Sequence, residues 1–106
     1  MFQLKWSAAE KKIARSAYDA ALHAALNKVM TEFKQKAQAA ASPSEMWDLQ
    51  NYLGDRRWEI SSIFIYSYSK LPLVFAWSLR NGCLEEKALA GLSDDKLKVI
   101  RSMAKD

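Results

Sequence analysis

The residue types that usually carry chemistry are sparse in this sequence. His23 is the only histidine and Cys83 the only cysteine, and the two lie far apart along the chain. A thiol nucleophile or a general base needs a positioned partner, and a metal site needs several ligands. Asp19, one helical turn from His23, has the spacing of two groups on a solvated helix face. There is no Gly-rich phosphate loop. We therefore predict that the chain is not an enzyme and holds no metal.

Carboxylate and aromatic residues are concentrated in one stretch, residues 42–60. When successive residues are placed 100° apart around a helix, this stretch has three faces. The acidic face has the spacing of a solvated surface and is formed by Glu45, Asp48, Asp55 and Glu59. A narrow apolar stripe, suited to docking on a core, is formed by Met46, Leu49, Leu53 and Ile60, with Phe64 continuing it.

The third face of this stretch combines tryptophans with polar residues. It contains Trp47, Asn51, Gly54 and Trp58, and Arg57 lies on its border with the apolar stripe. Trp and Arg are the residue types that most often anchor protein interfaces. Two interpretations stay open: the tryptophans pack against the first helix of the same or a second subunit, or they bind another protein.

Helix-start signals place this stretch within a long helix. Ser42 is suited to cap it, Pro43 to its first position and Glu45 to a capping box. The end is ambiguous, because residues 60–69 are rich in β-branched and aromatic types that also favour a strand. No turn signal precedes them and a lone strand has nothing to pair with, so we favour helix continuing through this segment.

A longer helix precedes it. Ser7 and Glu10 form a capping box, and no Gly or Pro interrupts the chain from Ala8 to Ala41. The apolar stripe of this helix is Tyr18, Leu22, Leu26, Val29 and Phe33. Its alanines at positions 14, 17, 21 and 25 allow another helix to approach closely. The helix would be roughly 50 Å long, whereas a compact chain of this size has a radius of gyration of roughly 13 Å. We therefore expect a second long helix and a second subunit to cover it.

The remaining residues predict a small helical head. Ser69 is suited to cap a largely buried helix with Pro72 in its first turn, and Gly82 to stop it. A short helix over residues 85–90 and a last helix after Ser93 follow. The predicted fold is all-α: a single domain, 1–106, with an extended helical pair (7–68) and a helical head (69–106).

Charge and composition narrow the function classes. The chain has 106 residues, a net charge of +4 and one cysteine. This charge is well below that of a dense nucleic-acid-binding face. No segment approaches the ~20 apolar residues of a membrane span, and no signal peptide is evident at the start, so we expect a cytoplasmic location.

Five motifs in order and spacing resemble one family, the fluorescence recovery proteins of cyanobacteria. They cover nearly the whole chain: Trp6-Ser7-x-x-Glu10, Trp47-x-Leu49-x-x-Tyr52-Leu53 followed by Arg57-x-Glu59-Ile60, Tyr66-x-Tyr68-Ser69-x-Leu71, Val74-Phe75-Ala76, and Leu89-x-Gly91-Leu92-x-x-x-Lys96-Leu97-x-x-Ile100.

The resemblance implies an all-α homodimer without a cofactor that binds the orange carotenoid protein, chiefly through that protein's C-terminal domain. Such a regulator speeds the return of the red, quenching form to the orange form and helps to detach it from the phycobilisome, near the thylakoid surface. By position, the working surface maps to Trp47, Gln50, Asn51 and Arg57, and we add Trp58 from the same face. The family typically has a histidine and then an aspartate where this chain has Gln50 and Asn51, so a charge-assisted hydrogen bond would become a neutral one.

Two alternatives remain beside this hypothesis. One is a helical dimer of the same kind that binds a different protein. The other is a basic nucleic-acid-binding protein, whose affinity would fall steeply with salt. The Glu and Asp residues interleaved with the Lys and Arg residues make the second alternative the weakest.

Overall fold

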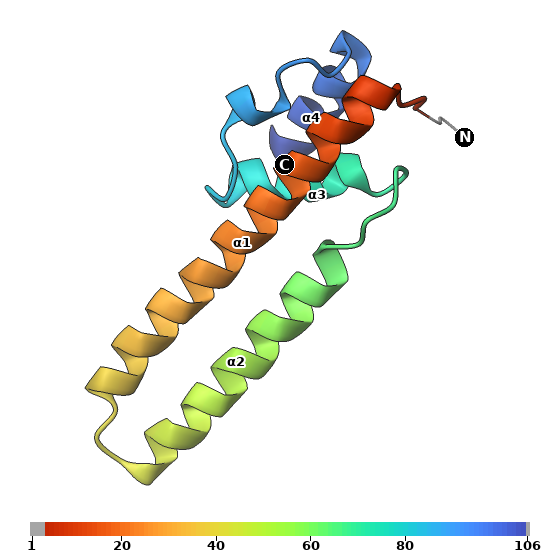
Figure 1. Cartoon of the computed structure of the whole chain (residues 1–106). Coiled ribbons are helices and arrows are strands. Elements are labelled where there is room, and N and C mark those ends of the chain that lie inside the picture. Colours follow the sequence, from red (N-terminus) through yellow and green to blue (C-terminus); the bar gives the residue numbers. More distant parts are fainter. Residues whose placement is uncertain (1–3, 106) are drawn as a thin grey trace.

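The structure is an elongated, all-helical hairpin with a globular end (Figure 1). This computed structural model describes residues 4–105, and within that range it contains no strand. Its elements are α1 (Ala8–Ala39), α2 (Pro43–Ile63), α3 (Leu71–Arg80), the 3-10 helix η1 (Glu86–Leu89) and α4 (Asp94–Lys105). The radius of gyration is 16.4 Å and the longest dimension 52 Å. A compact chain of this length would have a radius of gyration of roughly 13 Å, so the molecule is elongated.

The two long helices begin where the caps predict. The Ser7 hydroxyl accepts a hydrogen bond from the Glu10 backbone N–H at 3.1 Å, and the Glu10 carboxylate accepts one from the Ser7 N–H at 3.0 Å. Ser42 accepts from the Glu45 backbone N–H, with Pro43 at the first position of α2. The capping box predicted with Glu45 is incomplete, because the Glu45 carboxylate accepts from the backbone N–H of Ala41 and not from that of Ser42. These local signals satisfy backbone donors that a helix start would otherwise leave unpaired.

The hydrophobic core lies at one end of the molecule. It is built by the first half of α1 together with α3, η1 and α4, and its buried members are Ala14, Ala17, Tyr18, Leu71, Val74, Phe75, Ala76, Leu89, Leu92 and Ile100. The last buried residue of α1 is Ala25, and α2 has no buried residue at all. We call residues 4–25 together with 64–105 the head, which includes the first half of α1 in addition to the helical head predicted over 69–106, and residues 26–63 the arm.

The inner side of α2 differs from the predicted apolar stripe. Leu49 and Ile60 are partly covered, as predicted, but Met46 and Leu53 are exposed. Tyr52, Arg56 and Glu59 are also partly covered, although Glu59 was predicted on the solvated acidic face. The Lys36 ammonium lies 5.2 Å from the Tyr52 ring centre. Within one chain, the stripe therefore only partly faces α1.

The prediction that helix continues through residues 60–69 is right to Ile63 and wrong beyond it. The chain leaves the helix through two tight turns, in which Ile65 N–H donates to Ile63 O and Ser67 N–H to Ile65 O. This exit lets Phe64 and Tyr66 pack edge-on against Tyr18, with ring centres 5.5 and 4.9 Å away. Burying these aromatic rings on the head outweighs the few helical hydrogen bonds that continuation would add.

The start of α3 also differs from the prediction. Lys70 occupies the cap position with no side-chain capping bond, so Ser69 is not the cap. The backbone N–H groups of Lys70 and Leu71 instead donate to the Ser67 carbonyl. Pro72 lies in the first turn as predicted.

A buried ion pair ties the last helix to the first. Lys96 Nζ lies 3.1 Å from both carboxylate oxygens of Glu10, and the Ser93 backbone N–H donates to Glu10 Oε2 at 2.8 Å. The two charged side chains are only 5% and 11% exposed. The backbone donors Ser7 and Ser93, followed by Lys96, lower the pKa of Glu10 from 4.5 to about 2, against the opposing effect of burial.

We expect Glu10→Gln to lower the free energy of unfolding by about 3 kcal/mol, because it leaves the Lys96 ammonium buried without a counter-charge. Urea titration at neutral pH measures this loss. The control is Glu85→Gln, which removes a carboxylate from an ion pair with Lys87 that is 74–84% exposed. That change should cost less than about 0.5 kcal/mol. Equal losses for the two variants would contradict the structural role of Glu10.

The same carboxylate predicts a pH dependence. Its folded-state pKa of about 2 lies below the unfolded value of 4.5, so its contribution is complete above pH 4.5 and is lost as the pH falls toward 2. Stability measured across that window should therefore fall more steeply for the native chain than for Glu10→Gln. Parallel curves for the two proteins would show that Glu10 does not carry this dependence.

Candidate protein-binding face

Large apolar side chains are exposed along the arm. Trp58 is 74% exposed and Trp47 59%, and the exposed fractions of Leu26, Met30, Met46 and Leu53 lie between 39% and 52%. Single exposed apolar residues are common, but a concentration of them on one part of a small chain marks an interaction surface. The arm therefore carries the strongest candidate site in the described residues.

A groove of about 540 Å³ runs between α1 and α2. Its apolar wall is formed by Leu26 and Val29 of α1 with Leu53 and Ile60 of α2. Its remaining lining comes from α2 and consists of Gln50, Gly54, Arg56, Arg57 and Ser61. Apolar walls with a polar and cationic rim are typical of sites that receive a protein side chain or helix.

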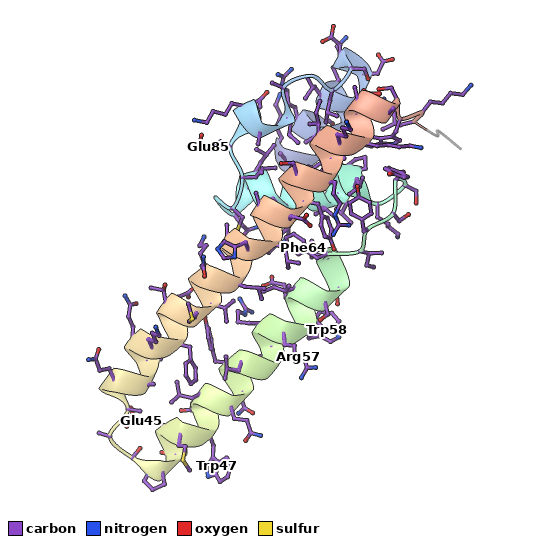
Figure 2. All side chains as sticks on the ribbon, in the orientation of Figure 1. Glu45, Trp47, Arg57, Trp58, Phe64 and Glu85 are labelled. Carbon is purple, nitrogen blue, oxygen red and sulfur yellow. The ribbon has the colours of Figure 1, made fainter. Side chains whose placement is uncertain are left out.

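The structure separates the five predicted site residues into two groups. Gln50 and Arg57 line the groove. Trp47, Asn51 and Trp58 are exposed and are not among its lining residues. Figure 2 shows Trp47 and Trp58 projecting from the side of α2 away from α1. The site is thus a strip along a helix, with a span of roughly 17 Å from Trp47 to Trp58 at 1.5 Å per residue. A strip of this shape suits a protein surface better than a small molecule.

The neighbouring arginines of α2 have different environments. Arg56 lies inward, with its guanidinium 5.9 Å from the Tyr52 ring centre and 3.3 Å from a Glu59 oxygen. Arg57 is exposed, and in the described part of the chain it forms no ion pair. Of these two arginines, only Arg57 is therefore available to an approaching carboxylate.

Gly54 in the wall of the groove has no internal explanation. A Cβ added there would meet no atom within 4 Å, and its backbone is helical. Glycine inside an exposed helix costs roughly 1 kcal/mol relative to alanine. A small residue in this place is understandable if the backbone of another molecule approaches the groove closely.

Residues that sequence reasoning did not assign to the site also contribute. The long α1 stripe placed Leu26 and Val29 against a second helix, but their role as one wall of an open groove depends on how α1 and α2 pair. Met30 is exposed beside them on the same helix. The only available signal was the mismatch between the length of α1 and the size of the chain.

The residues considered for catalysis lack the required environment. His23 is exposed and its ring Nε2 lies 3.0 Å from the Asn27 amide. Burial raises the pKa of the Cys83 thiol, which disfavours the nucleophilic thiolate. Residues 4–105 contain no cluster of three or more potential metal ligands. None of the helices described is both long enough and apolar enough to cross a membrane.

Comparison with known proteins agrees with the fold and the sequence motifs. The family model described as photoprotection regulator fluorescence recovery protein matches residues 6–104. A curated fluorescence recovery protein from Synechocystis sp. is 26% identical over 100 residues, which are 94% of this chain and 92% of that protein.

Solved structures of fluorescence recovery proteins superpose closely on this chain. The protein from Fremyella diplosiphon has a TM-score of 0.89 and 31% identity, over 96% of this chain and all of that one. The Synechocystis sp. protein has a TM-score of 0.88 and 25% identity with the same coverage. With a family match that spans nearly all of its length, the chain belongs to the fluorescence recovery protein family of photoprotection regulators.

Proposed function

We propose that the chain is a non-enzymatic, cytoplasmic regulator that binds the orange carotenoid protein and accelerates its return from the red to the orange form. This would relieve quenching at the phycobilisome. The proposal rests on the family membership of this chain together with one observation. Trp47, Arg57 and Trp58 are all exposed on the α2 strip, the part of α2 that runs from Trp47 to Trp58. A regulator of this kind must bind the compact or transition-like form of its partner better than the open form. A helix whose anchors are already fixed in place loses little entropy on binding.

The proposed assembly is a homodimer in which a second copy covers part of the arm. Three features support it: the arm lacks a buried residue in α2, the groove has an apolar wall, and Gly54 leaves room for a backbone. In a two-fold dimer the same patch on both copies would be covered. The outward tryptophans would then remain available to the carotenoid protein.

We expect Leu53→Glu to convert the dimer to a monomer, because it places a carboxylate on the apolar wall of the groove. Leu53 is already 39% exposed within one chain, so the helical content should stay unchanged. Sedimentation velocity with far-UV circular dichroism measures both quantities. The matched control is Asn51→Glu, which adds the same charge to α2 outside the groove lining. If Leu53→Glu stays dimeric, the groove is not the dimer interface.

We expect the chain to accelerate the dark relaxation of red carotenoid protein, and Trp47→Ala to reduce the acceleration by about tenfold or more, the loss of a tryptophan anchor. The absorbance change of the carotenoid protein measures the rate. The control is Asp48→Asn, a change on the neighbouring acidic face. The paired change Gln50→His with Asn51→Asp should increase the acceleration of the relaxation above that of the native chain, because a carboxylate accepts a stronger hydrogen bond than an amide.

A second candidate is a dimer of the same architecture with another protein partner. The polar residues Gln50 and Asn51, which depart from those typical of the family, favour it. Under this alternative the native chain and the paired variant both leave the relaxation rate of the carotenoid protein unchanged. Partners captured by the native chain, and lost with Trp47→Ala and Arg57→Ala, would then identify the true target.

A further inference from the structure

The net positive charge of the chain lies on the head. Residues 4–25 and 64–105 contain eleven Lys and Arg against six Asp and Glu, whereas residues 26–63 contain five of each. One head cation, Lys96, is buried in its pair with Glu10. Arg15, Lys87 and Arg101 are in exposed ion pairs with acidic side chains of the head. Neither the α2 strip nor the groove uses any cation of the head.

Some of these cations surround a hollow on the head. The hollow has a volume of about 340 Å³ and lies where the last turns of α3 and α4 meet η1. These two helices pack against each other (Figure 1). Leu79 and Ala104 are its partly buried apolar members, and Arg80, Arg101 and Lys105 are its exposed cations. Glu86, its one carboxylate, pairs with Arg101.

Helix stability explains part of this arrangement. A cation in the last turn of a helix interacts favourably with the negative end of the helix dipole, and both Arg80 and Lys105 are in such positions. That effect would be satisfied wherever the two helix ends lay. It does not account for cations from two helices placed around one hollow with an apolar interior.

We propose that this hollow binds an acidic segment of a partner protein. In that segment acidic residues flank one apolar residue, and the apolar side chain enters the hollow. The apolar side chain would contact Leu79 and Ala104, and the carboxylates would face Arg80 and Lys105, the two rim cations that have no ion pair among the described residues. Rim charges of this kind mainly raise the association rate and orient the partner. The hollow would therefore be a second contact, independent of which protein the arm binds.

A nucleic acid fits the same surface less well. A phosphate backbone needs a continuous basic track, and the head interrupts its cations with Glu85, Glu86, Asp94 and Asp95. Glu86 repels a phosphate and a carboxylate alike, so the apolar interior formed by Leu79 and Ala104 makes the difference: an acidic segment with an apolar residue can fill it, whereas a phosphate backbone cannot.

The test is a titration of the full chain with a short synthetic peptide of Asp and Glu around a single Leu, followed by NMR. We expect shifts centred on Leu79, Arg80, Arg101 and Ala104, and an affinity that falls as salt screens the rim. Peptides with Asn and Gln in place of the acids, or Ser in place of Leu, should bind more weakly. Trp47→Ala should bind the peptide like the native chain, so this result does not depend on the function proposed for the arm.

Charge reversal locates the site. Arg80→Glu with Lys105→Glu should lower the affinity for the peptide by about tenfold, because two rim cations are replaced by anions. The Gln versions of the same two changes, which perturb the helix ends less, should weaken it in the same direction. Lys12→Glu with Lys34→Glu makes the same change in net charge at exposed positions elsewhere, and should have little effect.

Three outcomes would overturn the proposal. One is equal weakening by the two charge-reversed pairs, which would mean that only net charge matters. Another is NMR shifts spread evenly over all lysine-bearing surfaces. The third is a single-stranded oligonucleotide that binds the hollow more tightly than the peptide, which would make the surface a phosphate site.

Discussion

The length of α1 determines which parts of the chain can be buried. This helix has 32 residues, and the core contributed by α3, η1 and α4 covers it only as far as Ala25. The second half contacts the head only near its start, where Lys28 donates to the Asn81 carbonyl, and it otherwise has α2 beside it within the described chain. A pair of helices has no interior in which to bury large side chains. Exposed apolar residues on the arm are the direct result. A helix that outgrows its core creates a binding surface without any change in the fold of that core.

The two parts of the molecule offer different kinds of contact. The arm is neutral in sum and presents apolar side chains, with Arg57 as the exposed arginine of its groove. The head is basic and well packed, and its last helix is fixed to the start of α1 by the pair of Glu10 and Lys96. Apolar contacts supply most of the affinity in protein complexes, while peripheral charges supply rate and orientation. A rigid connection between the parts would let both act on one partner.

Local chemistry decided how much could be predicted from the sequence. Ser7 and Ser42 predict helix starts because each caps a backbone N–H three residues further along the chain, and Pro43 fits the first position of α2. The end of α2 at Ile63 was missed because its cause, the packing of Tyr66 on Tyr18, is tertiary. Residue type and spacing placed Trp47 and Trp58 on one face of α2 but left open whether that face packs against a helix or faces outward, and the structure shows both side chains exposed. The groove depended on the pairing of α1 with α2, and the contact of Glu10 with Lys96 joins residues 86 apart in sequence. Neither leaves a periodic signal.

The absence of any buried residue in α2 also has a consequence for how the family can vary. Because the core omits this helix, the arm is a spacer whose length is almost independent of the folding of the head. Removing seven residues from each of α1 and α2 would shorten it by roughly 10 Å and turn each helix only about 20° from its former register. The reach of the molecule can therefore change in two-turn steps while the orientation of its side chains is kept. Such a chain can be refitted to a partner of different size without a new core.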